Sequence, residues 1–163
     1  MPPIRADQPL VSSVLDRLLD DDPETTTEPV RSRAQLLREL KLAVRRDIED
    51  LLNTRRRNML PPVGLKEVGH SLVTYGIPDF SGSGPVSVKD RDAFCRVLEG
   101  VIRQHEPRLI RVAVELAANP EAGDRTLRFR IDALLRADPA PEPVTFDSTL
   151  EPATSQFAVK GGG

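Results

Sequence analysis

The sequence has few of the residues that build metal centres, cofactor sites and disulfide bonds. It contains no tryptophan, one tyrosine, one cysteine and two histidines in 163 residues. The lone Cys95 excludes an internal disulfide bond and is compatible with a reducing compartment. Metal sites need clustered ligands, which Cys95, His70 and His105 do not form, and His105 has the position of a core or boundary histidine. We therefore expect no metal ion and no other cofactor.

Long apolar segments are also missing. No run approaches the roughly 18 apolar residues of a membrane-spanning helix. The N-terminus has no basic region followed by an apolar stretch, which is the pattern of an export signal. Aromatic residues make up 4% of the chain, so the core must consist mainly of Leu, Val, Ile and Ala. These absences favour a cytoplasmic, single-domain protein without direct membrane insertion.

Charge is unevenly distributed along a chain whose net charge is only −2. Residues 1–30 hold two basic and seven acidic side chains, whereas residues 31–57 hold nine basic and four acidic ones. Such opposed blocks indicate assembly contacts, or an acidic segment that folds near a basic helix. The basic run at 55–57 lacks the interleaved aromatic residues that favour nucleic-acid binding. We expect no nucleic acid as a partner.

Four segments carry apolar residues at helical spacing, namely 11–20, 32–54, 65–74 and 87–105. The first is expected to be a short helix in a mobile N-terminal arm, residues 1–31, because its surroundings are acidic and rich in proline and threonine. The segment 65–74 is expected to turn its apolar side chains inward. These are Leu65, Val68, Leu72 and Val73.

Local patterns support the two longer helices. Capping boxes are expected from two pairs, each three residues apart: Ser32 with Gln35, and Ser87 with Asp90. Stabilising charge pairs four residues apart are expected on the outer face of the 32–54 helix: Arg45 with Glu49, and Arg46 with Asp50.

The hydrophobic period changes from helical to alternating after residue 108. Two alternating runs predict an antiparallel hairpin over 108–136, and two short outer strands are expected at 143–147 and 156–159. A disordered tail is expected at 160–163. One face of the first hairpin strand should hold Ile110, Val112, Val114 and Leu116. Helices that precede a small, mainly antiparallel sheet define an α+β domain over 32–159, whose open sheet edges a partner strand could complete.

Glu106, Pro107 and Arg108 lie where the helical pattern stops and the strand pattern begins. Proline lacks a backbone donor and disfavours helical geometry in the residue before it, so this Glu-Pro-Arg corner is rigid. It holds a carboxylate and a guanidinium on either side of the turn. From these residues alone the corner is a structural bracket, an acid–base site or a docking point.

Catalytic patterns are weak. The chain has neither a Gly-x-Ser-x-Gly elbow nor a phosphate-binding glycine loop. Glycoside hydrolysis needs two carboxyl groups, and Glu106 with Asp79 could supply them. We expect Glu106 to pair with Arg108 or Arg111 instead, and a neighbouring guanidinium favours the ionised carboxylate, which does not suit a general acid at neutral pH. We therefore expect the protein not to be an enzyme.

Several segments taken together resemble the TssE family, the baseplate wedge subunits of the bacterial type VI secretion system. This family groups with the phage baseplate wedge proteins that are often labelled lysozyme-like. The likeness covers residues 11–159. The segments that carry it are Val14-Leu15-Asp16-Arg17-Leu18, Asp47-Ile48-Glu49-Asp50-Leu51-Leu52-Asn53-Thr54-Arg55-Arg56, Tyr75-Gly76-Ile77-Pro78-Asp79-Phe80, Glu106-Pro107-Arg108, Phe129-Arg130-Ile131 and Val144-Thr145-Phe146-Asp147.

The resemblance implies a non-enzymatic structural subunit that links wedge components and initiates assembly of the contractile sheath. It also implies a compact fold like the handshake part of a sheath protein, through which subunits interlock by strand exchange. The implied partners are other wedge subunits and sheath proteins, with the central spike hub as a further candidate. The implied location is the cytoplasm, at the inner face of the inner membrane.

The family's Glu-Pro-Arg motif corresponds to 106–108 and is implicated in assembly contacts. We expect four further residues in the matching blocks to bind partners: Arg55, Arg56, Asp79 and Phe80. Two other functions stay open. One is a glycoside hydrolase that acts on peptidoglycan, and the other is a generic adaptor whose acidic N-terminal arm binds a basic partner.

Overall fold

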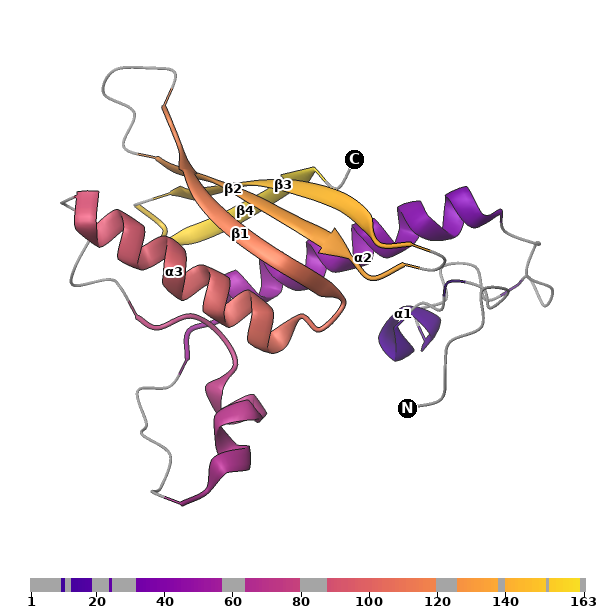
Figure 1. The fold of residues 1–163 in the computed structure, drawn as a ribbon, viewed down its shortest axis with the longest axis horizontal. Coiled ribbons are helices and arrows are strands. Elements are labelled where there is room, and N and C mark those ends of the chain that lie inside the picture. Colours follow the sequence, from indigo (N-terminus) through magenta and orange to yellow (C-terminus); the bar gives the residue numbers. More distant parts are fainter. Residues whose placement is uncertain are drawn as a thin grey trace.

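The computed structural model describes residues 10, 13–18, 24, 32–56, 64–79, 88–119, 126–137, 140–151 and 153–161. Helices precede a four-stranded antiparallel sheet, which confirms the predicted α+β class (Figure 1). The helices are α1 (Val14–Leu18), α2 (Arg33–Asn53), the 3-10 helices η1 (Lys66–His70) and η2 (Leu72–Thr74), and α3 (Val88–His105). The strands are β1 (Leu109–Ala117), β2 (Leu127–Leu135), β3 (Glu142–Glu151) and β4 (Gln156–Gly161).

The sheet is a meander in which β1, β2, β3 and β4 are neighbours in chain order and every pair is antiparallel. The predicted hairpin is confirmed as β1 and β2. Both outer strands are longer than predicted, because β3 has 10 residues and β4 runs to Gly161. Lys160 and Gly161 therefore lie in the sheet and not in the expected tail. The apolar alternation in β3 breaks at Ser148, a buried polar residue at an inward position, so the pattern predicted too short a strand.

β1 carries a bulge that the alternating pattern did not predict. Its register against β2 shifts between Ile110 and Ala113, and Arg111 has a φ of 54°, in the left-handed region. Because of the extra residue, Leu109 and Val112 are both buried, whereas Ile110 is only half-buried. The predicted apolar face of this strand is therefore wrong at Ile110.

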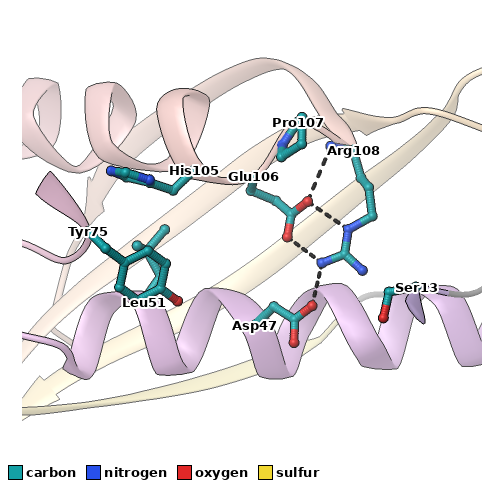
Figure 2. A pocket seen from close by; sticks show the side chains of 8 residues that line it. All are labelled: Ser13, Asp47, Leu51, Tyr75, His105, Glu106, Pro107 and Arg108. Atoms are coloured by element: carbon teal, nitrogen blue, oxygen red, sulfur yellow. Dashed lines mark hydrogen bonds and ion pairs between the residues drawn. The ribbon is translucent and has the colours of Figure 1, made fainter. Parts of the chain in front are cut away.

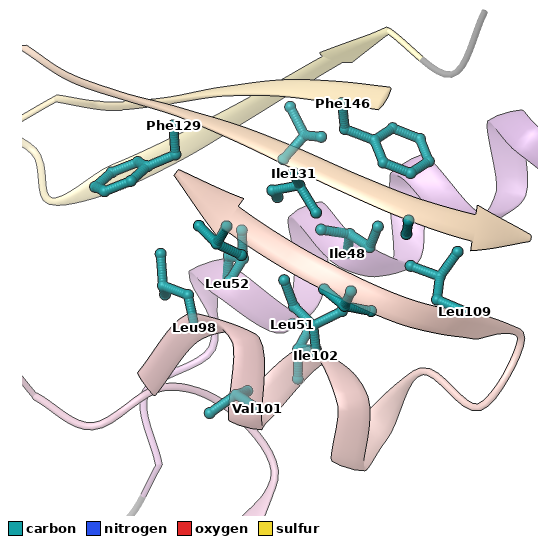
Figure 3. Close-up of a cluster of buried hydrophobic side chains, with 14 of the residues drawn as sticks. Ile48, Leu51, Leu52, Leu98, Val101, Ile102, Leu109, Phe129, Ile131 and Phe146 are labelled. Carbon is teal, nitrogen blue, oxygen red and sulfur yellow. The ribbon is translucent and has the colours of Figure 1, made fainter. Parts of the chain in front are cut away.

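One face of the sheet packs on α2 and α3, and the exposed strand residues lie on the other. Figure 3 shows side chains of both helices and of the strands meeting in one interior. Burial of a large apolar side chain stabilises the fold by about 1.5–3 kcal/mol, so this layer supplies most of the stability. The largest fully buried side chains include Ile48, Leu51, Leu52, Leu98, Ile102, Phe129, Ile131 and Phe146.

α2 begins where the sequence predicts. The Ser32 hydroxyl accepts the Gln35 N–H at 3.3 Å, and the Gln35 carbonyl oxygen Oε1 accepts the Ser32 N–H at 2.8 Å, which confirms the first capping box. Arg45 and Glu49 form the expected pair, at 3.6 Å. Ser87 lies outside the described residues, so the second capping box stays a prediction.

Most of the predicted N-terminal arm, 1–31, also lies outside the described residues, and its mobility stays a prediction. The part that is described includes α1, a helix of 5 residues within the predicted 11–20.

The single helix predicted over 65–74 is wrong. The two short 3-10 helices η1 and η2 occupy this segment, and three of the expected inward side chains are exposed, with Leu72 at 87%. Ser71 separates the two helices, because its N–H closes the last turn of η1 and its hydroxyl accepts the Val73 N–H at 3.3 Å.

Gly76 holds the segment after η2 against the end of α2. Arg55 and Ile77 form a parallel bridge, in which the Ile77 N–H binds the Thr54 carbonyl at 2.9 Å. Gly76 has a φ of 98°, and a Cβ atom there would lie 2.4 Å from the Thr54 carbonyl oxygen. Both the backbone conformation and the close contact therefore require glycine.

We expect Gly76→Ala to lower the free energy of unfolding by about 1–3 kcal/mol for the backbone conformation, with the clash against Thr54 adding to this loss. Gly100→Ala is the matched control, because Gly100 is exposed in α3 and its Cβ would meet nothing within 4 Å. Alanine should there raise the free energy of unfolding by about 0.5–1 kcal/mol. Urea unfolding followed by circular dichroism measures both, and equal stability of the two variants would contradict this role of Gly76.

Candidate partner-binding site

A surface hollow of about 290 Å³ opens at the Glu-Pro-Arg corner, where α3 turns into β1 (Figure 2). α2 forms its floor, the residue before α1 reaches one side, and the segment after η2 reaches another. Segments far apart in sequence thus contribute to one concave surface. The lining residues are Ser13, Asp47, Leu51, Tyr75, His105, Glu106, Pro107 and Arg108.

The corner itself is made by a few backbone interactions. The Glu106 N–H donates to the Ile102 carbonyl at 2.8 Å and so ends the helical bonding of α3. Pro107 has no N–H to donate, and the Leu109 N–H turns back to the Glu106 carbonyl at 3.1 Å. The corner is therefore a tight bracket that fixes the direction of β1 relative to α3.

Glu106 and Arg108 form the ion pair that the sequence predicts. Arg108 Nε donates to Glu106 Oε1 at 2.7 Å, its backbone N–H donates to the same oxygen at 3.2 Å, and its Nη2 binds Glu106 Oε2. The Glu106 side chain is 6% exposed. The hydrogen bonds that Arg108 donates to Glu106 outweigh its partial burial and, together with Asp47, raise the pKa of Arg108. Arg108 therefore keeps its positive charge inside the hollow.

Asp47 is the charged residue of the hollow that the sequence does not predict, and the lining residues Ser13, Leu51, Tyr75 and His105 are likewise not predicted. Its Oδ2 accepts a hydrogen bond from Arg108 Nη2 at 2.5 Å, which joins α2 to the corner. Its Oδ1 accepts from Arg46, and Arg46 reaches Asp16 of α1 at 2.7 Å. Five charges of alternating sign therefore run from Glu106 to Asp16. The helical spacing places Asp47 one turn before the core residue Leu51. Its partner Arg108 is 61 positions away, so spacing along the chain does not reveal the pair.

The pair predicted between Arg46 and Asp50 is wrong, because Arg46 turns toward Asp16 and Asp47. Partial burial opposes ionisation of Asp16, but hydrogen bonds from Ser13 and Arg46 outweigh it and lower the pKa of this carboxyl group. A lowered pKa in the folded state means that the stabilisation is present at neutral pH and lost as the pH falls through that pKa. This contact attaches α1 to α2.

Two aromatic rings form another side of the hollow. Tyr75 and His105 make an edge-to-face contact, with ring centroids 5.3 Å apart. His105 Nε2 lies 3.1 Å from the Thr74 carbonyl oxygen, so the expectation of a core or boundary histidine is confirmed. Burial, followed by the charges of Asp50, Asp47 and Glu106, raises the pKa of Tyr75. Burial and the nearby carboxylates therefore both keep this hydroxyl group protonated.

The arrangement does not suit acid–base chemistry. Arg108 engages both oxygens of the Glu106 carboxylate, the group that would have to protonate a leaving group. Asp79 is exposed and does not line the hollow. Within the part of the chain that the structure describes, no group of three His, Cys, Asp or Glu side chains could hold a metal ion.

Neither Arg55 nor Arg56 lines the hollow. Arg55 donates to the Ser155 carbonyl at 2.5 Å and to the Leu52 carbonyl at 3.2 Å, so its guanidinium serves the fold. Arg56 is exposed three residues after α2, and Phe80 lies outside the described residues.

We expect Asp16→Asn to loosen α1, because Arg46 then loses a charged partner. A partly exposed ion pair of this kind contributes about 1 kcal/mol, so tryptic cleavage after Arg17 should become about two- to five-fold faster. Asp50→Asn is the control, because sequence spacing alone pairs Asp50 with Arg46. Mass spectrometry of timed digests measures both rates, and faster cleavage in Asp50→Asn would favour the pairing inferred from spacing.

Arg108→Ala should lower the free energy of unfolding by about 3–5 kcal/mol, because it leaves the Glu106 carboxylate buried without its partner. Arg130→Ala is the control, because its pair with Asp147 spans 3.6 Å on the exposed face of the sheet. The control should change stability by at most about 1 kcal/mol. Urea unfolding compares the two, and similar losses would show that the corner pair does not hold the fold.

A model of the family described as baseplate wedge protein gp25 matches residues 38–140. The match begins within α2, contains Asp47 and the Glu-Pro-Arg corner, and ends after the β1–β2 hairpin. No curated protein sequence matches the chain. No helix in the described ranges combines the length and the apolar character that crossing a bilayer requires. The chain therefore belongs to the baseplate wedge protein gp25 family, which is the family of TssE.

Proposed function

We propose that this protein is a non-enzymatic subunit of a type VI secretion baseplate that links wedge components and initiates the contractile sheath. The observation that carries the proposal is the family match over 38–140, which contains the corner and every residue that lines the hollow except Ser13. In this view the protein works in the cytoplasm, at the inner face of the inner membrane, through the assembled baseplate.

The hollow is the surface that we assign to another wedge subunit. Arg108 Nη1 is buried, and among the described residues it has no hydrogen-bond acceptor. An unpaired buried donor is unfavourable by about 1–3 kcal/mol, so an incoming carbonyl or carboxylate oxygen would gain from meeting it. Glu106 and Pro107 set the position of this donor, which gives the whole corner a role in docking.

α1 offers a second contact for a wedge subunit. Val14, Leu15 and Leu18 are all exposed, although they form the apolar face of this helix. A five-residue helix is not stable alone, and an apolar face without cover favours a partner. The exposed Arg56, with Asp79 and Phe80, completes the set of residues that we propose for partner binding.

Single substitutions at the corner disturb the fold as well as the contact, so the test uses a double variant. Replacing both members of a buried ion pair by neutral residues is often close to neutral for stability. We expect Glu106→Gln/Arg108→Met to keep an unfolding transition similar to that of the wild type. It should nevertheless fail to co-purify wedge subunits and fail to assemble sheaths in cells.

The matched control is Arg130→Met/Asp147→Gln, which removes an exposed ion pair on the opposite face of the sheet. The control should fold, recruit wedge subunits and form sheaths. Normal sheath assembly in the folded Glu106→Gln/Arg108→Met variant would refute a docking role for the corner. Wild-type protein that recovers no wedge subunit from a cytosolic extract would refute the baseplate assignment itself.

A further inference from the structure

Side chains from the helices cover both edges of the sheet, which sequence analysis had expected to be open. On the β4 edge, Asn53 of α2 binds both backbone groups of Phe157, with its Oδ1 accepting at 2.8 Å and its Nδ2 donating at 2.9 Å. Arg45 donates to the Val159 carbonyl at 3.0 Å, and Arg55 donates to the Ser155 carbonyl. α2 supplies three of these hydrogen bonds and Arg55, just after it, supplies a fourth, in places where a neighbouring strand would make them.

On the β1 edge, two side chains of α3 play the same part. Glu99 Oε1 accepts the Val114 N–H at 3.0 Å, and Arg103 Nη2 donates to the Val112 carbonyl. Glu99 and Arg103 are one helical turn apart and pair with each other at 3.4 Å. They therefore provide an acceptor and a donor in the places where an adjacent strand would provide them.

The two covers differ in how easily a strand could replace them. Asparagine has a short side chain, so Asn53 reaches Phe157 only because α2 itself lies close to the β4 edge. A new strand on this edge would have to displace Asn53, Arg45 and Arg55 together. On the β1 edge only Glu99 and Arg103 have to be displaced, and their longer side chains, 23% and 56% exposed, can leave the edge by rotation about their own bonds.

The backbone of β1 marks where a strand would begin to pair. Because the Val114 N–H points away from β2, the alternation of an antiparallel ladder turns the backbone groups of Leu116 outward as well. Among the described residues, no side chain binds these groups of Leu116. At the other end, the bulge around Arg111 interrupts the edge and blocks pairing there. The accessible stretch is therefore Val112–Ala117.

We propose that Glu99 and Arg103 form a displaceable clasp, and that an extended strand from a partner subunit replaces it on β1. The incoming strand gives Val114 a carbonyl acceptor and Val112 an N–H donor, and it extends the sheet by strand addition. The released side chains keep their ion pair with each other on α3, so no charge is left unpaired. This proposal rests on the proposed function, in which a sheath protein supplies the strand.

The clasp also explains how the free protein avoids pairing with its own copies. An uncovered strand edge is a template for self-association, and the clasp occupies the donor and acceptor at its centre. Closing the edge with side chains keeps it available for a strand that binds better. Glu99 and Arg103 thus prevent self-association through β1 and are displaced by the partner strand.

The test compares the full chain with Glu99→Ala/Arg103→Ala. Without the clasp, nothing has to be displaced, so affinity for the purified sheath protein of the same secretion system should rise about two- to ten-fold. The Val114 amide should exchange faster in the free variant, and sedimentation should show more self-association. Asn53→Ala is the control, and its affinity for the sheath protein should not rise, because Arg45 and Arg55 still bind the β4 edge.

Unchanged or weaker sheath-protein binding by a folded clasp variant would overturn the proposal. If the wild type and the variant both fail to bind the sheath protein, the proposed contact with the sheath is refuted. Amide exchange and sedimentation of the unbound protein then test the clasp. Faster Val114 exchange with greater self-association would support the clasp in that case. Wild-type behaviour in both measurements would refute it.

Discussion

The cross-link through Arg108 is the interaction on which the arrangement of the molecule depends. It binds Glu106 beside it on the corner and Asp47 on α2, so one guanidinium fixes where α3 turns into β1 and where that turn meets α2. The core alone would leave this junction free to shift, because apolar contacts have little directionality. A planar, permanently charged group with several donors supplies that direction. The same group also lines the hollow, so it serves both the fold and the surface that we propose for docking.

Both long helices serve the sheet in two ways. Their apolar faces fill the core, while polar side chains at the boundary of those faces bind the outer strands. The sheet has four strands, so half of them are edge strands with backbone groups that no neighbouring strand can bind. Polar residues at the margins of α2 and α3 solve that problem locally, without additional strands. The position of a residue around the helix axis thus determines whether its side chain packs in the core or binds an edge strand.

Periodicity and capping patterns predicted α2, α3 and the hairpin, because these features depend on neighbours in sequence. The bulge at Arg111 and the inward position of Ser148 escaped prediction, since only pairing with another strand reveals them. In the site, Glu106 and Arg108 could be paired from sequence because they are two residues apart. Asp47, Tyr75 and His105 come together only through the packing of distant segments. Arg46 likewise pairs with Asp16, which is distant in sequence, and not with Asp50 at helical spacing.

The hollow also determines the optical properties of the protein. Tyr75 is the chain's single tyrosine, and tryptophan is absent, so the ring beside His105 provides the longest-wavelength absorption and emission among the aromatic side chains. Whatever enters the hollow changes the surroundings of this one chromophore. The protein therefore carries a built-in, label-free spectroscopic reporter at the place where the corner meets α2.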